Sequence, residues 1–527
     1  MAKLKQSNIT QGMFYAVNLQ AQIINGSFEW TMEYLINKMD MSLFERNYCN
    51  DEHGAAAYPP RALLKLTFFC YSRGIITSRK IEKTARENLV AKALAEDFEP
   101  DYDTIATFIS TNSEAVTDLF TQVLMQCEKL KLIGGEMFAI DGCKLPSNAS
   151  KEWSGTIEEL IKKRDKLKQY ISRLMQQHTE MDKDEKAKKR LKTFKKTMGD
   201  DKERHARSVE RLEKKLQKLN EFLEKAEPRK GMSKDEVKSN ITDNESAFIK
   251  GPHGFIQGYN GIAIADSTNQ VIICAEAIGS GPESGCFPEM LDSLEENMKT
   301  VTGKEKPLEK ALVAGDSGFF TEDNLQEAAK RSVQVLIPDP QFRQRDAYFA
   351  EKKEEKVVKQ KKKFSSEDFI YNEEEDSFTC PSGKTLEYKC DVELRNNTGR
   401  QYKAKIVDCR NCKLAGECIM KRGKNETTVK TPRTLYIPYM KYEKNLSEEM
   451  KHKIDDPVNR ELYSRRMQIV EPVFANITHH KGMDRFTLRM QEKVNIQWKM
   501  FCIVHNIWKC AVPLALKLKI KSGLGLI

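Results

Sequence analysis

The chain has 527 residues, of which 39% are hydrophobic and 31% are charged, and its formal net charge at pH 7 is +10. This length and apolar content are enough for several hydrophobic cores rather than one. The excess of positive charge permits a polyanionic partner, although a diffuse lysine excess commonly serves solubility alone.

The sequence predicts neither secretion nor a membrane span. The N-terminus lacks the long apolar run of a signal peptide, and no uninterrupted apolar stretch reaches about 18 residues. Residues 501–516 come closest, but His505, Lys509 and Pro513 interrupt them, and we interpret this segment as a core helix. The chain has 13 cysteines. Without a secretion signal they indicate a reducing, cytoplasmic location, with free thiols or a metal site instead of disulfides.

Residues from about 10 to 130 are predicted to be helical. One helix begins at Tyr58-Pro59-Pro60 and ends at Gly74, and Ser78 is expected to cap a short basic helix. This order is compatible with a helix-turn-helix whose second helix enters a DNA major groove. An ordinary helical bundle with a solvated basic face gives the same pattern. The proposed DNA contacts on the second helix are Arg79, Lys80 and Lys83.

Two apolar runs each end in an acid. Residues 137–140 precede Asp141, and residues 311–315 precede Asp316. Each run is predicted to be a buried strand that presents a carboxylate at its C-terminal end. Gly142, directly after Asp141, lets a ligand approach the backbone closely. Asp266, at the end of another predicted strand, competes for a metal-binding role.

Between the two acids lies a highly charged segment, residues 156–228, with almost no glycine or proline. Two apolar seams and a polar middle favour an antiparallel helical hairpin inserted into the fold. A parallel, dimerising coiled coil is the alternative, and the basic flank of either structure can touch DNA. The seams are Ile157, Leu160, Leu167, Ile171 and Leu174, then Val209, Leu212, Leu216, Leu219 and Leu223.

After Pro228 the pattern changes to strands. Residues 255–266 and 271–275 are predicted strands, followed by a helix at 288–298 and the strand before Asp316. A helix at 321–331 and a strand at 333–337 complete the segment. With the first strand, the order is β-β-β-α-β-α-β, which resembles a ribonuclease-H-like mixed sheet.

A lysine–glutamate run at 346–363 is expected to be a solvated linker, and a cysteine cluster follows it. Zinc prefers four tetrahedral thiolates, so the cluster predicts a small zinc-ribbon-like module with a structural ion. Cys390 is a fifth candidate ligand, and reduced, metal-free thiols are the alternative. The four expected Zn²⁺ ligands are Cys380, Cys409, Cys412 and Cys418.

A third acid, Glu471, lies in a basic helical segment. At 100° per residue, Tyr463 and Glu471 share one broad face, with Arg466 at its edge. A tyrosine and an arginine beside a catalytic acid would grip the phosphate backbone near the scissile bond. The last helix carries Val494, Trp498, Phe501, Val504 and Trp508 at helical spacing, which predicts a buried face.

Asp141, Asp316 and Glu471 are therefore predicted to hold two Mg²⁺ or Mn²⁺ ions about 4 Å apart for phosphoryl transfer on a polynucleotide. Each acid also has an ordinary interpretation. Asp141 can end a strand as a turn residue, Asp316 can begin a Ser-Gly loop, and Glu471 can pair with Arg466 on the surface.

Several short motifs together resemble bacterial insertion-sequence transposases of the DDE class, over nearly the whole chain. They are Tyr58-Pro59-Pro60, Phe138-Ala139-Ile140-Asp141-Gly142-Cys143-Lys144, Gly258-Tyr259-Asn260, Gly315-Asp316-Ser317-Gly318 and Glu471-Pro472-Val473-Phe474. The resemblance implies binding of transposon terminal inverted repeats, strand cleavage and strand transfer into target DNA by one active site. It also implies a homodimer on paired ends of double-stranded DNA, in a bacterial cytoplasm, with the protein on the nucleoid when DNA-bound.

The resemblance assigns residues as well. Asp141, Asp316 and Glu471 become the metal-binding triad, and Tyr463 and Arg466 match the tyrosine and arginine of the Y-R-E-K signature. The signature's lysine would fall near Thr478, so that role is vacant. Lys481 is one expected substitute, and DNA contacts by His479 and His480 are the alternative. Further implied DNA contacts are Lys144 and Lys151.

The predicted fold is α/β: a ribonuclease-H-like mixed sheet with an N-terminal all-α domain, an inserted helical hairpin and an inserted cysteine-rich module. A catalytically inactive DNA-binding derivative and a stand-alone nuclease remain alternatives to an active transposase. The predicted parts are helical 1–132, first strand 133–155, hairpin 156–228, catalytic 229–345, linker and cysteine-rich insertion 346–430, and C-terminal catalytic helices 431–527.

Overall fold

The computed structural model describes residues 16–48, 56–188, 197–231, 235–251, 254–345, 364–394, 397–419, 431–439 and 445–521. The predicted linker at 346–363 lies outside these residues. The chain divides into two compact units. Unit 1 comprises Met1–Pro228, Lys238–Asp339 and Met450–Ile527, and unit 2 comprises Arg229–Val237 and Pro340–Glu449.

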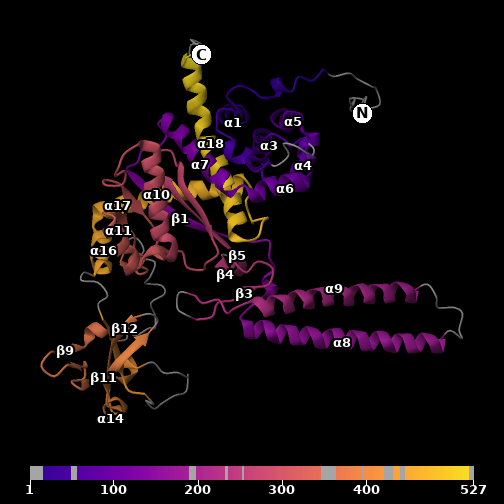
Figure 1. Ribbon diagram of the computed structural model, residues 1–527. Helices are drawn as coiled ribbons and strands as arrows, with labels where there is room; N and C mark the ends of the chain where they lie inside the picture. Colours follow the sequence, from indigo (N-terminus) through magenta and orange to yellow (C-terminus); the bar gives the residue numbers. More distant parts are fainter. Residues whose placement is uncertain are drawn as a thin grey trace, which may run out of the picture. The chain divides into compact units, whose positions relative to one another are not determined.

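The N-terminal part of unit 1 is helical, as predicted (Figure 1). Helix α3 has proline in its first turn, where a missing N–H costs no helical hydrogen bond. The chain then turns at Gly74, whose φ is +73°. The next helix begins with Ser78 itself, after Thr77, so the predicted cap at Ser78 is wrong by one residue. The elements are η1 (Gln20–Gln22), α1 (Phe28–Ile36), α2 (Ser42–Glu45), α3 (Pro60–Ser72), α4 (Ser78–Glu87), α5 (Leu89–Leu94), α6 (Tyr102–Thr111) and α7 (Ser113–Lys129).

A six-stranded mixed sheet follows, in the order β4-β5-β1-β7-β8, with β6 also paired to β5. Strand β5 is antiparallel to β1 and β6, whereas β7 is parallel to β1 and β8. This mixed sheet, with the first strand inside it, fits the predicted ribonuclease-H-like architecture. The strands are β1 (Met137–Pro146), β4 (Ala247–Gly251), β5 (Gly254–Asp266), β6 (Ile272–Ile278), β7 (Leu312–Ala314) and β8 (Gln334–Leu336).

Helix α18 joins the sheet to the N-terminal helices, because it packs on β6 and also on α7, α1 and α3. Trp498 and Phe501 are fully buried, and the Trp498 indole donates a 2.9 Å hydrogen bond to the carbonyl of Ile262. The predicted helical domain and catalytic domain therefore share one core. The other helices of this part are η3 (Ser284–Cys286), α10 (Phe287–Thr302), η4 (Ser317–Phe319), α11 (Glu322–Lys330), α16 (Leu446–Asp455), α17 (Pro457–Ala475), η7 (Asn476–His480) and α18 (Gln491–Lys521).

Among the described residues, only the Gln491–Leu518 stretch of α18 is long and apolar enough to cross a membrane. Half of its most apolar window is buried inside the structure. This burial supports the interpretation of the segment as a core helix.

The charged segment forms two long helices that lie side by side, α8 (Ile157–Lys188) and α9 (Thr197–Lys225) (Figure 1). Leu160, Ile171, Leu174 and Leu219 from the predicted seams are buried. The short strands β2 (Ser154–Gly155) and β3 (Ser239–Asn240) pair antiparallel next to the hairpin. The two seams therefore meet within one chain.

Unit 2 is built around a five-stranded antiparallel sheet, in the order β13-β12-β11-β10-β9. Strand β13 pairs with β12, and Leu435 from β13 is buried in the core of this unit. The insertion therefore extends past the predicted boundary at residue 430. The elements are α12 (Phe342–Arg345), η6 (Ser366–Asp368), β9 (Ile370–Asn372), β10 (Ser377–Thr379), β11 (Thr385–Leu394), β12 (Asn397–Ala404), α14 (Ile406–Arg410), α15 (Ala415–Cys418) and β13 (Thr434–Pro438).

Candidate active site

The register between β1 and β7 brings Asp141 and Asp316 together. The last parallel pair joins Ala139 to Ala314, and each aspartate lies two residues beyond its alanine. Parallel strands in register present equivalent positions at the same edge of the sheet. Asp316 follows its strand, as predicted, but Asp141 is inside its strand, because β1 continues to Pro146 alongside β5.

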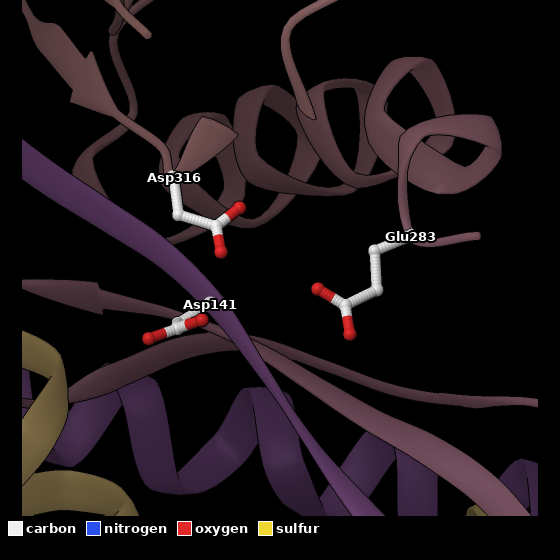
Figure 2. A group of neighbouring side chains, drawn as sticks. All are labelled: Asp141, Glu283 and Asp316. Atoms are coloured by element: carbon white, nitrogen blue, oxygen red, sulfur yellow. The ribbon is translucent and has the colours of Figure 1, made fainter. Parts of the chain in front are cut away.

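A third carboxylate, Glu283, completes the group, and the sequence analysis missed it. Asp141, Glu283 and Asp316 each offer a carboxylate oxygen, and these oxygens lie within 4.8 Å of one another. Figure 2 shows the three carboxylates around one common space, with Asp141 on β1 and the other two on loops. Glu283 directly precedes η3, at the end of the loop after β6.

The loop that carries Glu283 is fixed by the Gly258-Tyr259-Asn260 motif. The Asn260 side chain donates hydrogen bonds of 2.8 and 3.2 Å to the carbonyls of Ser280 and Gly281. At Gly142, an added Cβ would lie 3.3 Å from the Glu283 carboxyl carbon, so glycine allows this close approach. Gly258 allows another, since its Cβ would lie 2.1 Å from the carbonyl oxygen of Leu145. This motif therefore positions the site without contributing a charged group.

Two cations balance part of the negative charge. Arg466 on α17 forms a 2.8 Å ion pair with Asp141, and Lys144 on β1 lies 3.7 Å from Glu283. The Arg466 side chain is only 10% exposed, and its buried Nε has no hydrogen-bond partner. The arginine is therefore held at the site with one donor unused.

Burial is the main influence on both partly buried acids. It raises the pKa of Asp141, while Arg466 and the Gly142 N–H lower it and Asp316 raises it further. Burial also raises the pKa of Glu283, which Lys144 lowers and the charges of Asp316 and Asp141 raise. Asp316 thus disfavours the charge of Asp141 and Glu283, and Asp141 disfavours that of Glu283. A bound cation stabilises such an arrangement.

This donor set fits a hard divalent cation. Carboxylate oxygens are the ligands that Mg²⁺ and Mn²⁺ prefer, and no thiol or imidazole belongs to this group. Asp266, the competing acid, has another role. It is fully buried and accepts backbone N–H groups from Gly134, Gly135 and Thr268, as a turn-stabilising residue does.

The structure does not bring Glu471 into this group. The buried residues of α17 are Arg466, Ile469, Val470 and Val473, whereas Glu471 is exposed. Five residues separate Arg466 from Glu471, which rotates the glutamate about 140° around the helix from the arginine. Arg466, which was expected at the edge of the helix face that carries Glu471, therefore faces the acids. Glu471, which was expected to be the third metal ligand, faces away from them.

The other predicted DNA contacts fall in different environments. Arg79, Lys80 and Lys83 are exposed on α4, and Lys151 is exposed in η2 (Lys151–Trp153). Tyr463 is half-buried on α17. Lys481 is 2% exposed, hydrogen-bonds Asn476 and lies over the Trp508 ring. In this conformation Lys481 is an internal residue, and its burial lowers its pKa to about 8.

Comparison with protein families gives two matches. Residues 379–511 match a family described as a transposase DDE domain, and residues 17–111 match one described as a transposase domain (DUF772). No curated protein matches the chain. The first match begins at the last residue of β10 and includes all of α17 and most of α18. The second covers the helical region as far as the end of α6.

A mixed sheet of this topology with an acidic group at one edge is the architecture of a ribonuclease-H-like DDE domain. Both matched families are transposase families. Together the two matches support the resemblance of this chain to the DDE transposases of insertion sequences.

Proposed function

We propose that this protein binds transposon ends and catalyses metal-dependent strand cleavage and strand transfer at the site formed by Asp141, Asp316 and Glu283. The observation that carries the proposal is the convergence of their carboxylate oxygens within 4.8 Å. The three acids are far apart in the sequence, yet they meet at one edge of the sheet. A structural ion pair would need only one acid and one base, so a group of three acids is better explained by a bound cation.

The three carboxylates would hold Mg²⁺ or Mn²⁺, in two sites shared between them. A pair of such ions activates a water or a 3′-hydroxyl and stabilises the leaving oxygen of an in-line phosphoryl transfer. Arg466 and Lys144 lie beside the acids and present cations to a phosphate backbone. The unused Nε of Arg466 is a further donor for a phosphate oxygen.

The resemblance to DDE transposases implies Glu471 as the third acid, and we propose that cleavage also requires this residue. Because Glu471 is exposed and outside the group, it would act only after α17 rearranges on DNA. Glu283 needs no such movement. The two glutamates can therefore be separated by experiment.

For DNA binding we propose the exposed basic side of α4, with Arg79, Lys80 and Lys83. Only Ile81 and Ala85 of this helix are buried, so its three cations are exposed and can approach phosphates or bases. Two of them have exposed partners on the protein: Arg79 lies over the Tyr102 ring, and Lys83 pairs with Glu87. A homodimer that holds two double-stranded ends in the bacterial cytoplasm completes the proposal, because strand transfer of an element joins both ends to one target.

The test is cleavage and joining of duplex DNA that carries the element's own ends, with Mg²⁺ present. The wild type is compared with Asp316→Ala and with Glu289→Gln, an exposed control on α10. Joined product from wild type and control, absent with Asp316→Ala, supports the proposal. Cleavage without joining supports a nuclease, and end binding without cleavage by any variant supports a binding-only derivative.

A further inference from the structure

We propose that unit 2 contains a structural zinc site made by Cys380, Cys409, Cys412 and Cys418. All four line a single cavity of about 30 Å³. That space is enough for one ion or one water and too small for an organic ligand. The site belongs to unit 2 and is independent of the carboxylates in unit 1.

Cys380 is presented by a tight turn between β10 and β11. The Gly383 N–H donates to the carbonyl of Cys380 at 2.8 Å, and Gly383 has a φ of +73°. The next N–H, from Lys384, donates to the Cys380 sulfur at 3.3 Å. A backbone donor aimed at a sulfur stabilises the thiolate, which is the form that binds a metal.

The other three sulfurs come from a short segment around α14 and α15. Cys409 is in α14 and Cys418 ends α15, with Cys412 in the turn between them. The Cys409 sulfur accepts the Arg433 N–H at 3.4 Å, so it has a backbone donor like that of Cys380. A pair spaced C-x-x-C, as at Cys409 and Cys412, supplies two zinc ligands from one turn.

Two cationic side chains border the four sulfurs. Lys384 and Arg433 both line the cavity, and Arg433 is anchored by hydrogen bonds to the carbonyls of Cys418 and Phe364. Cationic side chains beside four cysteines would offset part of the negative charge that a four-thiolate metal site carries. Thiols that merely fill an apolar core need neither these cations nor backbone donors to sulfur.

The structure also selects among the five candidate cysteines. Cys390 is exposed on β11, opposite Gln401 of β12, and does not line the cavity. The remaining four line one cavity. Drawn onto one ion, they would give a closed set of four thiolates, which suits a structural ion and leaves no open position for catalysis.

Unit 2 has a physical need for such an ion. Among the residues that the structure describes, its core is one small cluster, and Cys409, one of the proposed ligands, belongs to it. A module with so small a core commonly depends on a metal or on disulfides for stability. The core residues are Phe369, Phe378, Leu386, Tyr402, Ala404, Cys409 and Leu435.

The experiment is metal analysis of the full-length protein purified without chelator, alongside Cys409→Ser, Cys412→Ser and the matched control Cys390→Ser. We expect about one zinc per chain in the wild type and in Cys390→Ser, and loss of most zinc in the other two variants. In the wild type, we also expect a thiol reagent to modify the four ligands at least about tenfold more slowly with zinc than after its removal.

The thiol measurement uses wild-type protein, so it stands even if the serine variants fail to fold. Absence of bound zinc, with thiol reactivity unchanged when zinc is added, would overturn the proposal. Iron in place of zinc would overturn the choice of metal. Neither result bears on Asp316, so the zinc site and the proposed transposase activity fail or succeed separately.

Discussion

Replacing Glu283 with glutamine tests which glutamate completes the carboxylate group. The three carboxylate oxygens lie within 4.8 Å of one another, and two unit charges at that limit repel by about 3.5 kcal/mol at an effective dielectric constant of about 20. Glu283→Gln removes two such repulsions, and it loses an attraction of about 4.5 kcal/mol to Lys144 at 3.7 Å. The metal-free variant should therefore be about 2 kcal/mol more stable than wild type, or about 4 °C higher in melting temperature.

The same substitution should remove stabilisation by metal. A ligand at 100 times its Kd stabilises a folded protein by about 2.7 kcal/mol, and the variant should lose most of this gain with Mn²⁺. Loss of one carboxylate from the metal site should also cost about 3 kcal/mol in the cleavage barrier, or about 100-fold in rate.

The assays are thermal unfolding with and without Mn²⁺, then cleavage of end-bearing DNA, for Glu283→Gln, Glu471→Gln and the control Glu289→Gln. Without DNA, only Glu283→Gln should lose the Mn²⁺-induced shift. Wild-type metal stabilisation and cleavage in Glu283→Gln would refute the reasoning from the described geometry. Loss of cleavage in Glu471→Gln, with metal stabilisation retained, would show that α17 rearranges on DNA.

Three further predictions follow from the same geometry. Asn260→Ala should release the loop that carries Glu283 and weaken the free energy of Mn²⁺ binding by about 1–3 kcal/mol. Calorimetry on the folded variant measures this, and an unchanged Mn²⁺ affinity would contradict the positioning role of Asn260. The pKa values of Asp141 and Glu283 are raised in the folded state, so the folded protein holds these protons more tightly than the unfolded chain does. The free energy of unfolding of the metal-free protein should therefore fall as pH rises from the ordinary carboxyl range, about 4, through the raised pKa values. Across that window Mn²⁺ affinity should increase, because the ion displaces the protons, and a titration series that shows the opposite slope would exclude this cause. Gly258→Ala places a Cβ 2.1 Å from a backbone oxygen and should lower the free energy of unfolding of unit 1 by about 3 kcal/mol or more. The control Gly416→Ala has open space around its Cβ and should leave thermal unfolding of unit 1 unchanged.

Much of the fold could be predicted because local patterns report burial directly. The apolar runs before Asp141 and Asp316 became β1 and β7, and the two leucine seams became α8 and α9. Each of these elements is defined by residues close together in the sequence, so the periodicity of apolar side chains is sufficient to predict it. The two aspartates were found for the same reason, since each directly follows a buried run.

Glu283 could not be found in this way. It lies in a loop rich in glycine, proline and serine, and it has no apolar run directly before it. Its place in the group depends on Asn260 holding the loop and on Gly142 allowing the approach. One signal for Glu283 was available in the sequence. The loop that carries it connects β6, a predicted strand, to a predicted helix, and an acid in such a loop is a candidate site residue.

The sequence by itself indicated the mixed α/β class, two apolar helical seams, the strands that carry Asp141 and Asp316, and a cluster of five candidate cysteines. Only the tertiary structure decided that Arg466 faces Asp141 while Glu471 is exposed, that Cys390 lies apart from the other thiols, and that Lys481 is internal. The physical reason is the sequence separation of the contacts involved. Periodicity within one element indicates which of its sides is buried. The rotation of α17 and the register of β1 against β7 instead arise from contacts between segments far apart in the sequence.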